Sequence, residues 1–299
     1  PLCCFTRLGN GFTALGLYNF GNAVFSAVGD TRRPLRYLSL AGVVNIVLNL
    51  FFVIVCGMDV AGVATASVIA QYLSAGLVVT ALFRSHDEMY GLHFMRLRLH
   101  RSRSRAILSI GLPAGMQYGI FALANLFIQM GVNSFDATMV AGNSAAANED
   151  ALIYDVMAAF YTACGSFIGQ NYGARQKDRV RRSYLISMAY SFGIGTAMGL
   201  AILAVGPSFL SLFTEDPAVV DAGMKRLTIM SLSYGTSAFM DCTIAASRGL
   251  GKSLVPTIIV ILGSCVFRIA WIYTVFAYFQ TVPSLYLLYI FSWIITAVA

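Results

Sequence analysis

Long apolar segments alternate with short polar connectors along the whole chain. The apolar segments cover approximately residues 8–28, 36–56, 61–83, 106–133, 151–170, 184–205, 227–247, 254–279 and 283 to the end. Most are about 20 residues long, the length that a helix needs to cross roughly 30 Å of hydrocarbon. Because backbone groups inside a bilayer have no water to bond, such segments must be helical. The pattern predicts an all-α integral membrane protein with eight or nine spans.

The composition supports a membrane protein and argues against a soluble enzyme. Apolar residues make up 58% of the chain and charged residues 11%, and the mean hydropathy is +0.73. Soluble domains carry about 25% charged residues, and their buried apolar stretches are shorter, about 10 to 14 residues. The six cysteines are scattered without metal-ligand spacing. We therefore expect a protein that is not an enzyme and that holds no metal.

The basic residues are concentrated in alternate connectors. Of the 20 basic residues, 16 fall in four connectors. These are Arg32, Arg33 and Arg36; Arg84, Arg96, Arg98, Arg101, Arg103 and Arg105; Arg175, Lys177, Arg179, Arg181 and Arg182; and Arg248 with Lys252. The intervening connectors are uncharged (280–283) or acidic, with Asp59; Asp136, Glu149 and Asp150; and Glu215, Asp216 and Asp221. The positive-inside rule therefore places the basic connectors in the cytoplasm. Their charge suits anionic lipid, and we expect no nucleic-acid partner.

An internal repeat indicates two related halves. Residues 29–34 and 251–256 share the pattern G-x-[TS]-x-x-P at a separation of 222 residues, and each copy precedes a long apolar helix. The copies enter the membrane in the same direction, as parallel repeats do. If the second lobe has six helices, the first shows its last three, and about three helices precede Pro1 in the complete protein. The last span also ends early, so we expect a fragment.

Several motifs, in the right order, carry a family resemblance. Gly29-Asp30-Thr31 with Pro34, followed by Asn45 and Asn49, resembles the region between the fourth and fifth helices of multidrug and toxic compound extrusion (MATE) transporters. The later motifs that resemble the family are Gly169-Gln170 with Gly173-Ala174, and Arg248-Gly249 with Gly251 and Pro256. The resemblance implies two lobes of six helices, of which about nine helices are present here. Residues 1–84 would hold helices four to six, 85–105 a cytoplasmic connector, and 106–299 helices seven to twelve, the last one truncated.

The resemblance also implies a function. Members of this family are secondary active antiporters that export organic cations and other xenobiotics in exchange for Na⁺ or H⁺, with two lobes rocking around a central cavity. The expected partners are small cationic or amphipathic substrates and membrane lipid, with no cofactor besides the coupling ion. We expect a multi-pass monomer in the plasma (cytoplasmic) membrane of a bacterium.

Asp241 is the principal candidate for ion coupling in the second lobe. It lies inside the span 227–247, about two turns before Arg248. Ionisable groups inside the membrane are unfavourable and therefore mark functional positions. A carboxylate there can exchange a proton or pair with Na⁺ or a cationic drug. The alternative is a structural ion pair with Arg268, the one basic residue well inside a span.

Further candidates lie on either side of the span 151–170 and in the first lobe. Asn148, Asp150 and Asp155 flank its outer end, where one acid could line the mouth of a cavity. For the neighbouring Glu149, a solvated rim is the favoured interpretation. In the first lobe, Asn45, Asn49 and Ser67 match the position of a cation-binding group in the resembled family. The alternative is a pair of asparagines that pack helices through hydrogen bonds.

The alternative function is a lipid-linked saccharide flippase of the same superfamily. Such a protein needs cationic side chains in its central cavity to hold a pyrophosphate. Only Arg268 is predicted to lie there, since Arg7, Lys225 and Arg226 fall near the outer ends of spans. The sequence therefore favours the exporter, and the number of basic residues that line the cavity should separate the two functions.

Overall fold

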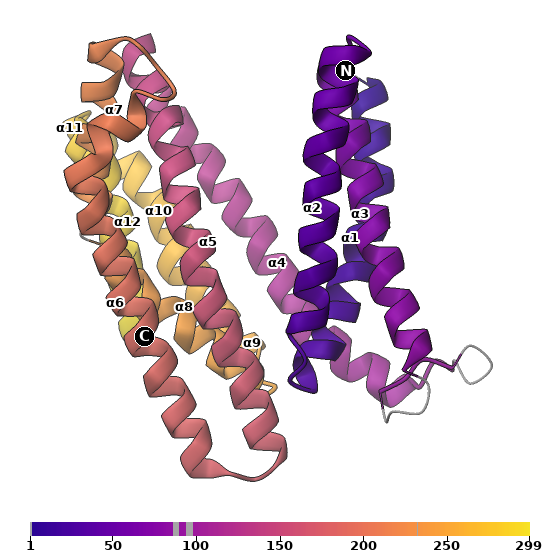
Figure 1. Cartoon of the computed structure of the whole chain (residues 1–299). Helices are drawn as coiled ribbons and strands as arrows, with labels where there is room; N and C mark the ends of the chain where they lie inside the picture. Colours follow the sequence, from indigo (N-terminus) through magenta and orange to yellow (C-terminus); the bar gives the residue numbers. More distant parts are fainter. Residues whose placement is uncertain (1, 86–89, 94–97, 232) are drawn as a thin grey trace. The chain divides into compact units, whose positions relative to one another are not determined.

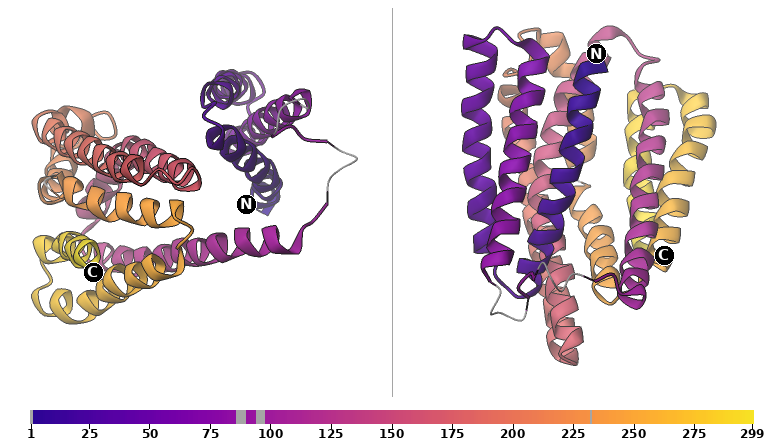
Figure 2. Two further views of the ribbon diagram at one scale, coloured as in Figure 1. Left: turned by 90° about the horizontal axis from the view of Figure 1, so that it is seen from below. Right: turned by 90° about the vertical axis from the view of Figure 1, so that its right-hand side faces the viewer.

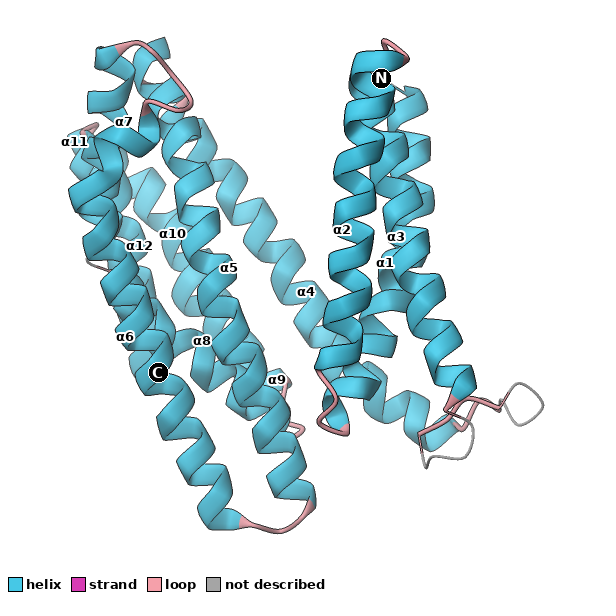
Figure 3. Cartoon of the chain, in the orientation of Figure 1, coloured by secondary structure: helices cyan, strands magenta, loops and turns pink. Residues whose placement is uncertain are grey.

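The computed structural model describes residues 2–85, 90–93, 98–231 and 233–299. Nearly all of these residues are helical, and no strand occurs among them (Figure 3). The prediction of an all-α chain is confirmed. The chain divides into two compact units, Pro1–Leu99 and His100–Ala299, and each is described by itself.

The first unit is a bundle of long helices. Its elements are α1 (Leu2–Ala27), α2 (Arg32–Leu50), the π-helical turn η1 (Phe51–Val55) that continues α2, and α3 (Asp59–Arg84). Figures 1 and 2 show α1, α2 and α3 side by side, and α3 packs against both others. Tyr18 and Phe25 of α1 pack with Val78 of α3 in its core. The Tyr18 hydroxyl also donates to the carbonyl of Pro34 at 3.3 Å, which ties α1 to the start of α2.

The second unit contains the remaining helices. They are α4 (Arg101–Val132), α5 (Ala137–Gly173), α6 (Lys177–Leu210), α7 (Pro217–Ser231), α8 (Tyr234–Gly249), α9 (Leu254–Val260), η3 (Ile261–Val266), α10 (Phe267–Trp271), η4 (Ile272–Phe276), α11 (Ala277–Phe279) and α12 (Val282–Val298). Elements α9 to α11 and the π-helical turns η3 and η4 form one continuous apolar segment, Leu254–Phe279. Helices α5 and α6 pack against each other, and both pack against α7 and α8.

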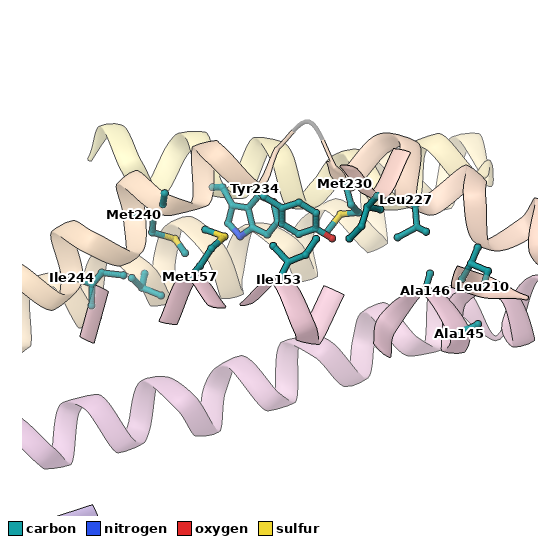
Figure 4. Close-up of a cluster of buried hydrophobic side chains, with 14 residues drawn as sticks. Ala145, Ala146, Ile153, Met157, Leu210, Leu227, Met230, Tyr234, Met240 and Ile244 are labelled. Atoms are coloured by element: carbon teal, nitrogen blue, oxygen red, sulfur yellow. The ribbon is translucent and has the colours of Figure 1, made fainter. Parts of the chain in front are cut away.

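The core of the second unit surrounds Tyr234, which is fully buried. Figure 4 shows this ring among Ile153 and Met157 of α5 and Met230 of α7. Glycines allow the helices to approach closely. A Cβ atom on Gly142 of α5 would lie 2.7 Å from the backbone nitrogen of Gly223 in α7. Such contacts between small residues bring helix backbones together in membrane proteins.

The two copies of the repeated motif adopt the same backbone conformation. Gly29 and Gly251 have φ angles of 87° and 79°, the left-handed region that glycine adopts without strain. In each copy the next residue donates its N–H to the carbonyl five residues earlier: Asp30 to Phe25 and Lys252 to Ser247, both at 2.9 Å. This is the hydrogen-bond pattern of a Schellman helix end.

Six helices among the described residues are long and apolar enough to cross a membrane. They are Arg32–Val55, Asp59–Arg84, Arg101–Val132, Ala137–Gly173, Lys177–Leu210 and Leu254–Phe279. Helix α12 is apolar but has only 17 residues. Asn19 and Asn22 interrupt the apolar part of α1, which is not among the six. The described residues therefore form a multi-pass helical protein, in which six helices meet this criterion of length and composition, against eight or nine predicted spans.

Two predicted boundaries were wrong. The expected connector at 134–150 is largely helical, because α5 begins at Ala137 and runs to Gly173. The expected single span at 227–247 is instead two helices, α7 and α8, and Asp221 lies within α7 rather than in a connector. Part of the predicted connector 85–105, including Arg96, lies outside the described residues, as does the side chain of Arg7.

Candidate functional site

One cavity in the second unit gathers charged side chains from several helices. Its volume is about 470 Å³, and residues of α4, α5, α7, α8, α10 and α12 line it. Three arginines (Arg226, Arg248 and Arg268) and two aspartates (Asp150 and Asp241) face it. Much of the remaining wall is aromatic, with Tyr118, Phe121, Tyr154, Tyr161, Tyr289 and Trp293. An apolar cavity of this size with a few charged groups is typical of a small-molecule site.

Asp150 belongs to a buried hydrogen-bonded network at one end of this wall. One carboxylate oxygen accepts from Arg226 and the other from the hydroxyl of Tyr234. Arg226 also donates to the side-chain oxygen of Asn143, which accepts a second bond from Tyr286 at 2.8 Å. Each of these five residues is less than 10% exposed. Because the network pairs the charges of Asp150 and Arg226, the burial of both becomes tolerable.

The sequence predicted that residues 148–150 lie at the outer end of a span. The position of Asp150 corrects this interpretation. This segment lies well inside α5, and Glu149 is 1% exposed rather than solvated. Its Oε2 atom is buried, with no hydrogen-bond partner in the described part of the chain. Asn148 is exposed and donates to the carbonyl of Ser144 at 3.2 Å. Asp155 is also exposed and does not line the cavity.

Asp241 lies in the middle of α8 and faces the cavity. It makes no hydrogen bond with another described residue and has no basic partner within the 4.0 Å of an ion pair. The alternative of a direct pair with Arg268 is therefore not present in this conformation, although both side chains line the same cavity. The Asp241 carboxylate is thus open to a cation or a proton from the cavity.

Arg248, near the end of α8, is held by neutral groups. Its Nη2 atom donates to the side-chain oxygen of Gln117 at 3.0 Å. The hydroxyl of Thr257 donates to the same oxygen at 3.3 Å. The guanidinium carbon lies 5.8 Å from the ring centre of Tyr118. Arg248 therefore has no carboxylate within 4.0 Å among the described residues, and Gln117 of α4 links it to Thr257 of α9.

Arg268 is the most deeply buried cation of the cavity, at 2% exposure. Its Nε atom donates to the hydroxyl of Ser292 on α12 at 3.0 Å. The guanidinium carbon lies 5.1 Å from the ring centre of Phe121 and 4.5 Å from that of Tyr289. Contacts with aromatic faces stabilise a guanidinium without neutralising it.

The candidates in the first unit lie on α2 and α3. Asn49 donates to the side-chain oxygen of Asn45 at 3.0 Å, so their bond stays within α2 and joins no other helix. The side-chain oxygen of Asn49 is buried and accepts no bond from any described residue. Ser67 is half-buried on α3.

The later motif residues lie at the ends of α5 and α8. A Cβ atom on Gly169 would lie 3.5 Å from the carbonyl oxygen of Gly249, so the two helices approach there. The backbone carbonyl of Gln170 accepts a hydrogen bond from the backbone N–H of Ala174 at 3.0 Å, in the turn just after Gly173. Pro34 and Pro256 are both buried in the first turns of α2 and α9.

The comparison with family profiles decides the class of the protein. The profile described as MatE matches residues 113–274, which contain most of the cavity-lining residues. The chain belongs to the MATE family. Its relatives are transporters, which confirms both the family resemblance and the prediction that the protein is not an enzyme.

Similar MATE proteins occur in several bacteria. The chain is 26% identical over 245 residues to the probable multidrug resistance protein YpnP of Bacillus subtilis, covering 81% of this chain and 54% of that protein. It is 25% identical over 229 residues to the FAD transporter of Shewanella oneidensis, covering 75% and 50%. For the probable multidrug resistance protein NorM of Thermotoga maritima the identity is 24% over 277 residues, covering 86% and 57%. The chain spans about half the length of these relatives.

Solved MATE structures share the fold. An outward-facing multidrug resistance MATE transporter superimposes with a TM-score of 0.86 at 22% identity, covering 94% of this chain and 63% of that one. A MOP superfamily transporter from Pyrococcus furiosus superimposes with a TM-score of 0.87 at 22% identity, covering 96% and 65%. These matches confirm the predicted fold class, a helical membrane transporter.

Proposed function

We propose that the complete protein is a secondary active antiporter that exports organic cations and other amphipathic small molecules in exchange for Na⁺ or H⁺. Membership of the MATE family supports export, and two of the relatives described above are named as multidrug resistance proteins. The observation that carries the proposal is Asp241, a carboxylate without an ion-pair partner among the described residues, on an aromatic cavity inside the bundle.

Asp241 would couple the ion to the substrate. A carboxylate in an apolar bundle is unfavourable as a bare charge and gains free energy from a proton or Na⁺. The aromatic wall suits flat, amphipathic molecules and stabilises cations over its ring faces. If occupation by the ion and by the substrate favours different conformations, transport follows by alternating access. Asn45, Asn49 and Ser67 are candidates for a second cation site in the first lobe.

The membrane setting follows from the charge pattern. The connectors rich in arginine would face the cytoplasm and anionic lipid headgroups. We propose a multi-pass monomer in the cytoplasmic membrane of a bacterium, consistent with the bacterial relatives. The boundaries of the two lobes remain as proposed, at 1–84 and 106–299.

The flippase alternative must account for the charge of the cavity. The prediction that only Arg268 is a cavity-lining cation was wrong, because Arg226 and Arg248 also line it. Asp150 neutralises Arg226, however, and Asp241 opposes the remaining two arginines. A lipid-linked pyrophosphate carries more negative charge than this balance would neutralise. The charge balance therefore favours the exporter.

The experiment is dye efflux from cells that express the complete protein, its Asp241→Asn variant or its Asp155→Asn variant. The Na⁺ and H⁺ gradients are collapsed separately. We expect efflux that depends on one gradient, is lost in Asp241→Asn and is retained in the control, since Asp155 is exposed outside the cavity. Equal efflux by both variants would remove Asp241 from the mechanism. Absence of efflux from the well-expressed parent protein would contradict the exporter for these dyes.

A further inference from the structure

Two cysteines from different helices of the second unit meet in its interior. Cys164 of α5 and Cys242 of α8 are 78 residues apart in the sequence, and both are fully buried and free. The Sγ atom of Cys164 lies 4.0 Å from the backbone carbonyl oxygen of Cys242. The two side chains are also hydrogen-bonded to each other. The fold therefore brings together two thiol groups that are far apart along the chain.

Helices α5 and α8 approach each other closely beside this pair. A Cβ atom on Gly165, the residue after Cys164, would lie 3.2 Å from the carbonyl oxygen of Ala245 in α8. A Cβ atom on Gly249 of α8 would lie 2.6 Å from the carbonyl oxygen of Gly165. Small residues at such crossings let helix backbones come together. A disulfide requires Cα atoms about 4.4 to 6.8 Å apart, and this backbone contact brings the two cysteines into that range.

The surroundings of the two thiols favour a disulfide over a metal site. The Sγ atom of Cys242 lies 3.9 Å from the backbone carbonyl oxygen of Ser187 on α6, a weak hydrogen bond because a thiol is a weak donor. No group of three or more metal-ligating side chains occurs in the part of the chain that the structure describes. The strongest bond that the two sulfur atoms can form is therefore the one between them.

The cavity gives a small molecule access to the pair. Asp241, the residue before Cys242, lines the cavity, as does Ala245 of the same helix. Tyr161 lines it from α5, three residues before Cys164. The cavity volume of about 470 Å³ admits a small neutral oxidant such as hydrogen peroxide to the far side of this wall. Bulky thiol reagents, in contrast, have no direct route to side chains that are fully buried.

We propose that Cys164 and Cys242 are a modification site, which hydrogen peroxide oxidises to a disulfide between α5 and α8. One sulfur attacks a peroxide oxygen as the thiolate, the O–O bond breaks, and the leaving hydroxide takes up the thiol proton as water, which leaves a sulfenic acid. The second sulfur then attacks the sulfenic sulfur. The S–S bond forms, the S–O bond breaks, and a second water leaves. The two thiols lose two electrons, and one peroxide is reduced to two waters.

The disulfide would join the two helices that carry the acids of the cavity. Asp150 lies on α5 and Asp241 on α8, next to Cys242. A covalent bond there limits how far α5 and α8 can separate, and reduction by a dithiol removes the limit. The inference goes beyond the proposed function and does not rest on it, because it concerns the packing and the thiol chemistry of one unit.

Peptide mass spectrometry of the complete protein in detergent tests the pairing. The protein is reduced, treated with hydrogen peroxide, denatured, alkylated and digested. We expect a cross-linked peptide that joins Cys164 to Cys242, lighter than the two reduced peptides together by two hydrogen atoms and lost after dithiothreitol. Cys265→Ser is the matched control, because Cys265 is a free cysteine that is also buried, at 1% exposure. The cross-linked peptide should persist in that variant.

Thermal unfolding gives a second readout that requires no transport. A disulfide between residues this far apart in the sequence constrains the unfolded chain, so the midpoint of the oxidised protein should rise by about 5 °C or more. Dithiothreitol should return it to the original value. Cys164→Ser and Cys242→Ser each remove one thiol and should show no rise, whereas Cys265→Ser should behave as the parent does. If a serine variant does not fold, the cross-linked peptide of the parent protein still decides.

Three results would overturn the inference. In the first, both cysteines of the peroxide-treated parent protein are still alkylated after denaturation. In the second, peroxide converts Cys164 or Cys242 to a sulfinic acid, or joins it to a different cysteine, instead of linking the two. In the third, a folded Cys164→Ser protein shows the same peroxide-dependent rise of the midpoint as the parent does.

Discussion

The buried charges of the second unit differ in how they are satisfied. Asp150 and Arg226 form a network with Asn143, Tyr234 and Tyr286, in which each side chain is hydrogen-bonded to a side chain on another helix. Asp241 and Arg268 face the cavity without a charged partner within 4.0 Å among the described side chains, and Arg268 is hydrogen-bonded only through Nε, to Ser292. The first pair suits a structural role, because breaking it would leave a buried charge. The second pair suits binding, because a ligand or an ion supplies what is missing.

This distinction predicts different consequences of mutation. Asp150→Asn leaves Arg226 buried without its counter-ion, which should destabilise the protein by about 3 to 5 kcal/mol. Thermal unfolding of the complete protein in detergent would show the loss as a lower midpoint. Asp155→Asn, an exposed change on the same helix, should leave the midpoint unaltered. Equal midpoints for the two variants would mean that the network contributes little.

The sequence identified Asp241 and Arg268 because each is a charge inside a long apolar segment. It did not identify Arg226, Tyr234 or the burial of Asp150. Polar side chains that are hydrogen-bonded to one another inside a bundle lower the local hydropathy as much as a solvated connector does. A hydropathy pattern therefore cannot distinguish the two. One signal was available: Asn143 and Asp150 are seven residues apart, two turns along one helix face.

At the scale of helices, close approach depends on residues without side chains. The backbones of α5 and α7 meet at Gly142 and Gly223, where a Cβ atom on Gly142 would lie 2.7 Å from the carbonyl oxygen of Val219. This contact lies on the same two helices as the Asp150 network. Packing of small residues therefore holds α5 and α7 near enough for Asp150 to reach Arg226.

Gly142→Ala should push these helices apart. The added methyl group would meet backbone atoms that cannot move independently, so we expect a loss of about 1 to 3 kcal/mol of stability. Gly193→Ala on α6 is the matched control, because its Cβ atom would have no neighbour within 4 Å. The comparison is again thermal unfolding in detergent. A larger loss for Gly193→Ala than for Gly142→Ala would contradict the packing argument.

Helix boundaries were predictable where a connector contains glycine or charged residues. They were not predictable where polar residues lie inside a helix and take part in a buried network. The predicted spans 36–56 and 61–83 agree closely with Arg32–Val55 and Asp59–Arg84. The predicted start of the span 151–170 was wrong by 14 residues, because Asn143, Glu149 and Asp150 are buried inside α5. The separation of α7 from α8 was also missed, because the residues beside it, such as Ser231, Ser233 and Gly235, are uncharged and do not mark a connector in a pattern of charge and hydropathy.

For the whole molecule, a chain of the MATE family carries in its second unit a cavity lined by three arginines and two aspartates. The two parallel copies of the G-x-[TS]-x-x-P motif end their helices with the same backbone bonds. Asp241 of the second unit is an acidic side chain, whereas Asn45 and Asn49 of the first unit are neutral amides. We expect ion coupling to depend on Asp241 more strongly than on Asn45 or Asn49, because a carboxylate can carry a proton or balance the charge of a cation.

The most direct measurement follows ion movement in proteoliposomes that contain the complete protein. An imposed substrate gradient should drive Na⁺ or H⁺ in the opposite direction, recorded with an ion-sensitive dye inside the vesicles. We predict a counter-flow of the ion that Asp241→Asn abolishes and Asp155→Asn preserves. Substrate movement without any opposing ion flux, or an undiminished flux in the Asp241→Asn protein, would contradict antiport through this cavity.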